Sequence, residues 1–208
     1  MFYETRARDK TLLPHDPFKA IIAPRPIGWI STRALDGRVN LAPYSFFNAF
    51  ASVEAPIVGF SSEGFKDSAA FAEESGEFVF NLATHDLMTQ MSLTSAPLPR
   101  GASEFEHAGL TMAPCRLVAA PRVAEAHASL ECKVTQVLQL KIRAGADLNN
   151  FLVFGEVVAF HLDDALIRGG RFDTAAAEPL ARCGYQDYAV TDRVIELARP
   201  AGGGDAQR

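Results

Sequence analysis

The chain has 208 residues and a mass of 22.5 kDa, a length that favours one domain and leaves room for two small ones. Apolar residues make up 48% and charged residues 22%, which excludes a collagen-like, coiled-coil or wholly disordered chain. Lys and Arg number 20 against 25 Asp and Glu, a net charge of −5 that argues against a general nucleic-acid binder, since such proteins carry a basic face.

The cysteines and the N-terminus indicate the compartment. Cys115, Cys132 and Cys183 are scattered, with no CxxC pair and no Cys/His pair at zinc spacing, so we expect a reduced chain and no metal site. The first ten residues are charged and lack the apolar core of a secretory signal. The most apolar stretches, such as Phe151–Leu162, are too short to span a bilayer. A soluble cytoplasmic protein is predicted.

The N-terminal part of the chain predicts a hairpin. Residues 18–41 contain β-favouring side chains, among them Ile21 and Ile22, and are expected to form two strands. Asp36-Gly37 is a strong turn pair between them.

The next elements are a strand, a helix, a strand and a helix. Pro56–Ser61 is typical of a short buried strand. A helix is predicted over Asp67–Ser75, capped by Asp67 or Ser68 and ended by Gly76. Glu77–Leu82 alternates as a strand does, and a second helix is predicted over about His85–Thr94.

The later part of the chain is rich in Val, Leu and Phe over three stretches. These are Arg116–Ala119, Ala128–Leu140 and Phe151–Leu162. In total we expect six or seven short strands and two or three short helices without regular alternation, which favours a mostly-β antiparallel barrel with helical insertions. We expect a single domain over residues 1–198, with a barrel over about 18–162, a C-terminal extension over 163–198 and a disordered tail over 199–208.

Several common catalytic motifs are absent from the sequence. There is no GxGxxG after a strand, no GxxxxGK[ST] and no HExxH, and the five histidines never lie at metal-ligand spacing. The nearest approach to a GxSxG elbow, at residues 59–64, lacks the second glycine. These absences exclude the nucleotide, metal and serine chemistries that have clear signatures.

The segment 61–68 (SSEGFKDS) has the chemistry of a phosphate site. It connects a predicted strand to a predicted helix, whose first N–H groups and dipole favour an anion. Lys66 adds a positive charge, and Ser61, Ser62 and Ser68 add hydroxyl donors. An ordinary capped helix with a solvated lysine has the same sequence, so both interpretations stay open.

Two further segments predict a wall for a flat ligand. They are 24–32 (PRPIGWIST) and 40–48 (NLAPYSFFN), which the turn should bring side by side. Aromatic side chains offer an apolar plane, and Ser31, Thr32, Ser45 and Asn48 offer hydrogen bonds along an edge, as a heteroaromatic ring requires. The alternative is that Trp29 and the phenylalanines only fill the core.

These segments carry a family resemblance. PRPIGWIST, NLAPYSFFN and the Lys66-Asp67-Ser68 element, in this order and spacing, resemble the flavin reductase-like family over about residues 18–161. The resemblance implies a six-stranded antiparallel Greek-key split barrel that binds FMN, generally as a homodimer with the flavin near the subunit interface. It also implies an NAD(P)H-dependent flavin reductase that passes hydride from nicotinamide, a transient co-substrate, to flavin N5.

The resemblance also implies a set of FMN-binding residues. Ser31 and Thr32 would lie beside the flavin, and the ring or ribityl region would be contacted by Ser45, Phe46, Phe47 and Asn48. The ribityl phosphate would be held by Ser61, Ser62, Lys66, Asp67 and Ser68. Arg25 is a candidate second cation. Ser45 and Asn48 are candidates for stabilising the reduced flavin, and no acid–base residue is required because the cofactor carries the chemistry.

One departure from the family bears on the reductant. Its flavin reductases often carry a Gly-Asp-His element before the late Gly-Glu-Val strand, and here Asn150–Phe154 occupies that stretch without a histidine. The histidine is associated with the nicotinamide site, so an electron-transfer flavoprotein reduced by a partner protein stays open as the alternative. An interaction module of the same fold that binds no flavin is a third interpretation. His127 and His161 lie nearby in sequence, and lone strand histidines are more often structural.

Overall fold

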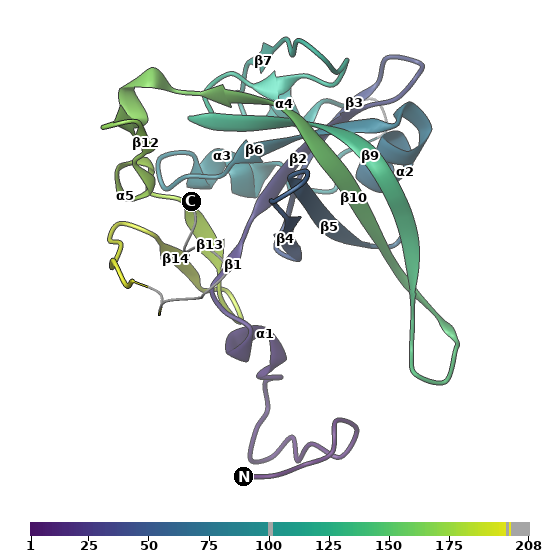
Figure 1. The fold of residues 1–208 in the computed structure, drawn as a ribbon. Coiled ribbons are helices and arrows are strands. Elements are labelled where there is room, and N and C mark those ends of the chain that lie inside the picture. Colours follow the sequence, from purple (N-terminus) through teal and green to yellow (C-terminus); the bar gives the residue numbers. More distant parts are fainter. Residues whose placement is uncertain (100–101, 199, 201–208) are drawn as a thin grey trace.

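One curled antiparallel sheet of seven strands forms the body of the protein (Figure 1). The structure is a computed structural model that describes residues 1–99, 102–198 and 200, so the predicted disordered tail lies outside the described residues except for Pro200. The strand order is β3-β2-β6-β9-β10-β5-β4. In chain order the strands are β2 (Gly28–Arg33), β3 (Val39–Tyr44), β4 (Phe47–Ala51), β5 (Ile57–Glu63), β6 (Glu77–Leu82), β9 (Ala128–Lys141) and β10 (Asp147–Leu162).

The connection between the two edge strands curls the sheet into a barrel. β3 and β4 stand at opposite ends of the strand order, yet only Ser45 and Phe46 separate them along the chain. This short link draws the two edges together. The mostly-β antiparallel barrel expected from the sequence is confirmed, and its sheet has seven strands where the family resemblance implied six.

The barrel interior is filled by apolar side chains and covered by helix α2 (Asp67–Ser75). Ile30, Phe60 and Phe78 are fully buried there, together with Ala69 and Ala72 of α2. The predicted bounds of α2 are confirmed, and Gly76 ends it in the left-handed conformation. Its N-cap is Lys66, with no side-chain cap, where Asp67 or Ser68 was expected; both belong to the first turn.

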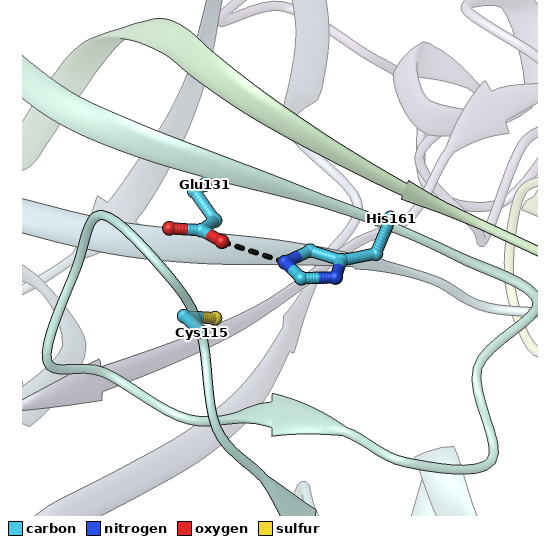
Figure 2. Close-up of side chains that lie close together, drawn as sticks. All are labelled: Cys115, Glu131 and His161. Atoms are coloured by element: carbon cyan, nitrogen blue, oxygen red, sulfur yellow. Dashed lines mark hydrogen bonds and ion pairs between the residues drawn. The ribbon is translucent and has the colours of Figure 1, made fainter.

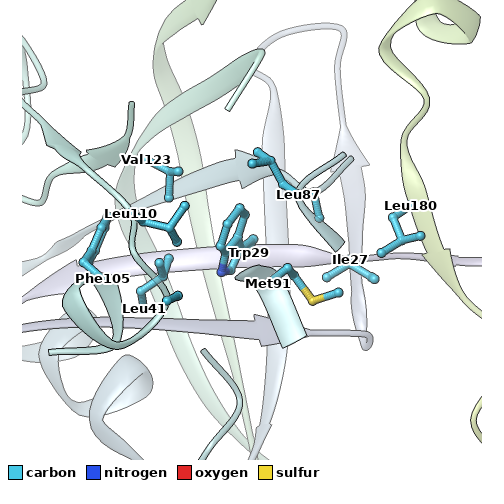
Figure 3. Close-up of a cluster of buried hydrophobic side chains, with 11 residues drawn as sticks. Ile27, Trp29, Leu41, Leu87, Met91, Phe105, Leu110, Val123 and Leu180 are labelled. Atoms are coloured by element: carbon cyan, nitrogen blue, oxygen red, sulfur yellow. The ribbon is translucent and has the colours of Figure 1, made fainter. Parts of the chain in front are cut away.

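A second core lies on the outer face of the same sheet (Figure 3). Successive residues of a strand point to opposite faces, so Trp29 enters this outer core while Ile30 enters the barrel. Trp29 is fully buried, and its indole N–H donates to Thr94 Oγ1 over 2.9 Å. The outer core is covered by α3 (Met88–Leu93), α4 (Glu104–His107) and the hairpin of β7 (Met112–Ala113) and β8 (Arg122–Val123).

A small sheet beside the barrel joins the segment just before the first barrel strand to the C-terminal extension. Its strand order is β1 (Arg25–Pro26), β13 (Leu180–Arg182) and β14 (Tyr188–Val190), so the C-terminal extension packs against the start of the barrel. The extension also contains a 3-10 helix (Asp164–Leu166), β11 (Ile167–Arg168), β12 (Arg171–Phe172) and α5 (Thr174–Ala177). Among the described residues, the helices all fall short of the length and apolarity that a membrane crossing requires.

Three predicted elements differ in the structure. Ile21 and Ile22 do not belong to a strand: Phe18–Ile21 forms the short helix α1, and both isoleucines are exposed. Arg116–Ala119 forms no strand either, because its backbone N–H groups are bound by buried carboxylates rather than by a neighbouring strand. The second predicted helix is shorter than expected and starts at Met88.

Candidate functional site

A hollow of about 530 Å³ lies at the start of α2, and we call it the lysine hollow. Tyr44 of β3 and Lys66, Asp67 and Ser68 line it, so the predicted phosphate element borders a real cavity. Lys66 is exposed, and its side-chain ammonium makes no hydrogen bond or ion pair within the described part of the chain. The first N–H groups of the nine-residue α2 have no intrahelical acceptor. This corner can hold an anion.

Acidic groups share the lysine hollow. Glu104 of α4 and Asp67 both line it, and Tyr44 is half-buried beside them. Burial raises the pKa of the Glu104 carboxyl and the pKa of the Tyr44 phenol above their ordinary values. Ser68 is buried, and its Oγ accepts a 2.6 Å hydrogen bond from Asn40 Nδ2.

A hollow of about 570 Å³ opens beside β4, and we call it the phenylalanine hollow. Its lining includes five residues singled out in the sequence: Ser45, Phe46, Phe47, Asn48 and Ser61. Phe47 stacks on Phe80 with parallel rings 4.8 Å apart, while Phe46 is 42% exposed. Oδ1 of Asn48 accepts from Ala49 N–H over 2.9 Å, so the two amide hydrogens of Asn48 are free to donate.

Arg25 also lines the phenylalanine hollow. It was expected to act as a second cation beside Lys66, which lines the lysine hollow instead. Its guanidinium is buried and donates to the backbone carbonyls of Lys19 and Ile22 and, over 2.8 Å, of Cys183. It also lies 5.7 Å from the centre of the Phe46 ring. Arg25 therefore fastens α1 and the C-terminal extension to the barrel at the edge of this hollow.

A smaller hollow of about 170 Å³ lies between the other two, and we call it the joining hollow. It shares Pro43 and Ser95 with the lysine hollow, and Ser45 with the phenylalanine hollow. The three hollows therefore form a row along residues 42–48, with Lys66 at one end and Phe46 and Phe47 at the other. Arg182 and Tyr188, which the sequence analysis did not single out, also line the joining hollow.

Three of the predicted site residues lie inside the protein and line none of the three hollows. Ser31 is fully buried, donates to the Pro121 carbonyl over 2.5 Å and accepts from Asn81 over 3.1 Å. Ser62 is fully buried and donates to the Gly64 carbonyl over 2.8 Å. Thr32 is fully buried, its Oγ1 has no partner among the described residues, and it pairs in register with Asn40, which lines the lysine hollow.

A separate cluster lies on the outer face of β9 and β10 (Figure 2). Cys115, Glu131 and His161 bring one possible ligand atom each within 4.8 Å of one another. Figure 2 shows the Glu131 carboxylate directed at the His161 ring, with Cys115 on the neighbouring loop. The three residues come from separate segments, so their spacing in the sequence does not indicate a cluster. Glu131 and His161 also border a hollow of about 640 Å³.

The hydrogen bonds of this cluster give it a structural role. Glu131 is fully buried and accepts from His161 and from the backbone N–H groups of Arg116, Leu117 and Val118. Burial opposes its ionisation, but the Arg116 N–H and His161 together hold the pKa of Glu131 below its ordinary value. Burial raises the pKa of Cys115 to about 11, so its thiol is protonated at neutral pH. The carboxylate is already fully hydrogen-bonded and fixes the loop to the sheet.

Comparison with known proteins agrees with this architecture. The profile of the family described as "Flavin reductase like domain" matches residues 22–176. An uncharacterized protein of Halalkalibacterium halodurans is 36% identical over 184 residues, which cover 86% of this chain and 87% of the relative.

Solved structures share the fold. Nitrilotriacetate monooxygenase component B from Bacillus cereus is 27% identical, with a TM-score of 0.85 over 95% of this chain and 98% of that one. Flavoredoxin of Desulfovibrio vulgaris, at 20% identity, shows the fold alone, with a TM-score of 0.71 over 88% of this chain and 93% of that one. From the profile match over most of its length, and from a relative above 30% identity, this chain belongs to the flavin reductase-like family and has its split-barrel fold.

Proposed function

We propose that the protein binds FMN in the row of three hollows and is an oxidoreductase of the NAD(P)H:flavin type. The observation that carries this proposal is the order of the row, in which an exposed, unpaired lysine at a helix start and an aromatic hollow lie at opposite ends of one chain segment. The groups of FMN follow one another in the matching order: a dianionic phosphate, a hydroxylated ribityl chain and a flat ring. Hollows of about 530 and 570 Å³ fall within the usual range for small-molecule sites, about 300–1,000 Å³.

The donors of the lysine hollow fit a phosphate monoester. Lys66 provides the charge, the first turn of α2 provides backbone N–H groups, and Ser68 provides a hydroxyl whose oxygen is already an acceptor for Asn40. The negative charges of Asp67 and Glu104 repel a phosphate in the same hollow, so the attraction between Lys66 and the phosphate must exceed this repulsion.

The phenylalanine hollow fits the ring. Phe46 and Phe47 offer an apolar surface, and Ser45 and Asn48 offer donors beside it. Bound FMN would supply a hydride-accepting ring nitrogen, N5. Ser45 and the free amide hydrogens of Asn48 would stabilise the negative charge that reduction leaves on the ring, because fixed donors need no reorganisation at that moment.

Cofactor binding is tested by the visible spectrum of the purified protein. We expect flavin absorption bands, and mass analysis of the released chromophore should identify FMN. A colourless protein that gains no bound flavin on addition of excess FMN overturns the proposal.

The reductant is tested by anaerobic stopped-flow mixing of the FMN-loaded protein with NADH and with NADPH. We expect the flavin absorption to bleach with one or both nucleotides. A specific observation favours the alternative, a carrier reduced by a partner protein: no histidine is found among the described residues that line the row of hollows. Bound flavin that dithionite bleaches and neither nucleotide bleaches assigns the carrier role instead.

We also propose a cytoplasmic homodimer. Exposed apolar side chains support an interface, notably Phe50 (56% exposed) beside the phenylalanine hollow and Phe160 (60% exposed) on β10. Figure 1 shows the β9–β10 hairpin reaching beyond the other strands, where a second copy can contact it. All three cysteines are free, as is usual in a reducing compartment. Light scattering coupled to size-exclusion chromatography tests the dimer, and a monomer at micromolar concentration overturns it.

A further inference from the structure

The joining hollow contains one charged side chain among the described residues, Arg182. Three hydroxyl groups, those of Ser45, Ser92 and Ser95, line the same small space, and Tyr188 completes the polar side. Its apolar side is formed by Ile27 and Met91, which also belong to the outer core in Figure 3. A cation and several hydroxyls around a volume of about 170 Å³ suit a small negatively charged group on a larger ligand.

The surrounding structure holds the Arg182 guanidinium in place. Arg182 ends β13 and pairs in register with Tyr188 of β14, whose ring centre lies 4.4 Å from the guanidinium carbon. Its Nη2 donates to the Tyr185 carbonyl over 2.5 Å. A guanidinium has five N–H groups, so donors remain for a ligand. Within the described part of the chain Arg182 has no carboxylate partner, and its charge is not neutralised.

The position of this cation within the row indicates its task. The following step rests on the proposed function, in which the phosphate lies at Lys66 and the ring lies at Phe46 and Phe47. In FMN the phosphate-bearing chain is attached at N10, next to N1 and the C2 carbonyl. The joining hollow lies between the two ends of the row. FMN in this orientation would place there its ribityl chain and the N1–C2 carbonyl edge of the ring next to that chain.

We infer that Arg182, supplied by the C-terminal extension, is a cofactor-contacting residue that stabilises the reduced flavin at its N1–C2 carbonyl edge and thereby raises its reduction potential. A hydride donor such as a reduced nicotinamide loses two electrons and one proton to N5, and the ring gains one negative charge shared by N1 and the C2 oxygen. A fixed cation beside that charge favours the reduced form over the neutral oxidised form. Tyr188 keeps the guanidinium oriented by stacking.

The test measures the reduction potential of bound FMN. The FMN-loaded protein is reduced stepwise with dithionite in the presence of a reference dye, and the affinity for oxidised FMN is measured in parallel. For Arg182→Gln we expect the ratio of affinities for reduced and oxidised FMN to fall about tenfold, equal to about 30 mV for a two-electron couple. Arg182→Lys, which keeps the charge, should recover most of the potential. The matched control is Arg171→Gln, an exposed arginine of β12 that lines none of the three hollows.

A purely structural role for Arg182 predicts a different result. If Arg182→Gln folds, binds FMN and keeps the wild-type potential, the inference is overturned while the proposed function stands. If the wild-type protein binds no FMN, both fail together. Should Arg182→Gln not fold, Arg182→His decides: we expect its potential to fall relative to wild type as pH rises through the range in which histidine loses its charge, about pH 6 to 7. A constant difference across that range overturns the inference.

Discussion

Nε2 of His161 lies 2.6 Å from Oε1 of Glu131. The same carboxylate accepts hydrogen bonds from three successive backbone N–H groups of the neighbouring loop. Glu131 is fully buried, so these hydrogen bonds replace all the solvation that the charge loses on folding. One side chain thus holds the loop that carries Arg116, Leu117 and Val118 on the outer face of the sheet.

Glu131→Gln should lower the free energy of unfolding at pH 7 by about 3 kcal/mol, because an amide cannot accept all of these hydrogen bonds. The pKa of Glu131 is held below its ordinary 4.5, so the unfolded chain binds the proton more tightly than the folded one. The stabilisation is therefore complete above about pH 5 and is lost as pH falls through the lowered pKa.

Urea unfolding followed by Trp29 fluorescence between pH 3.5 and 7 measures this difference, because Trp29 is the single tryptophan of the chain and is fully buried. Glu156→Gln, at an exposed position of β10, is the control and should match wild type. A wild-type-to-variant difference that is equal at pH 3.5 and pH 7 contradicts the assignment.

Lys66→Gln should weaken FMN binding about tenfold or more, since a charge-assisted hydrogen bond to phosphate contributes about 1.5–3 kcal/mol. Quenching of flavin fluorescence gives the dissociation constant. Lys10→Gln, at an exposed position near the N-terminus, should leave it unchanged. Unchanged affinity in Lys66→Gln places the phosphate elsewhere.

Glu104→Gln should have the opposite effect and tighten FMN binding a few-fold at pH 7, because it removes a negative charge from the lysine hollow. Burial raises the pKa of Glu104, so its carboxyl becomes neutral at a higher pH than an ordinary glutamate. The advantage of the variant should shrink as pH falls toward and through that raised pKa. Glu106→Gln, on the same short helix but outside the lysine hollow, is the control. Equal affinities for wild type and Glu104→Gln at pH 7 would show that the Glu104 carboxylate does not face the ligand.

Gly28→Ala should disturb the phenylalanine hollow. A methyl group at Gly28 would lie 2.6 Å from Cγ of Phe47, so the Phe47 ring must leave its stack on Phe80. Crowding of this kind costs about 1–3 kcal/mol of stability, and we expect FMN affinity to fall with it. Thermal unfolding and flavin titration measure the two effects. In the double variant with Phe47→Leu the loss should be less than additive, and full additivity would show that the two residues do not interfere.

Local elements were predictable because their signals are local. The turn at Asp36-Gly37, the helix Asp67–Ser75 and the strand Glu77–Leu82 have the predicted positions, since each depends on neighbouring residues alone. The strand predicted at Ile21 and Ile22 is wrong because their β preference is overridden. The Arg25 guanidinium donates to carbonyls of that segment and holds it in a helical turn.

The candidate site was only partly predictable. Residues 42–48 and 66–68 attracted attention through their own composition, and they do border connected hollows. The roles given to them as FMN ligands stay predictions. Arg182 and Tyr188 could not be found in this way, because only the pairing of β13 with β1 brings the C-terminal extension to the joining hollow. His161 and Glu131 likewise meet only through the register of β9 and β10.

The small sheet of β1, β13 and β14 has a consequence for how the family is divided into modules. The match to the family profile ends at residue 176, while Arg182 and Tyr188 lie beyond it. Arg182 belongs to β13, which pairs with β1, and Tyr188 belongs to β14, which pairs with β13. Chains that share the barrel but differ after residue 176 would keep the lysine and phenylalanine hollows and change the lining of the joining hollow. If Arg182 stabilises the reduced flavin as inferred above, sequence changes after residue 176 would alter the reduction potential while the barrel stays the same.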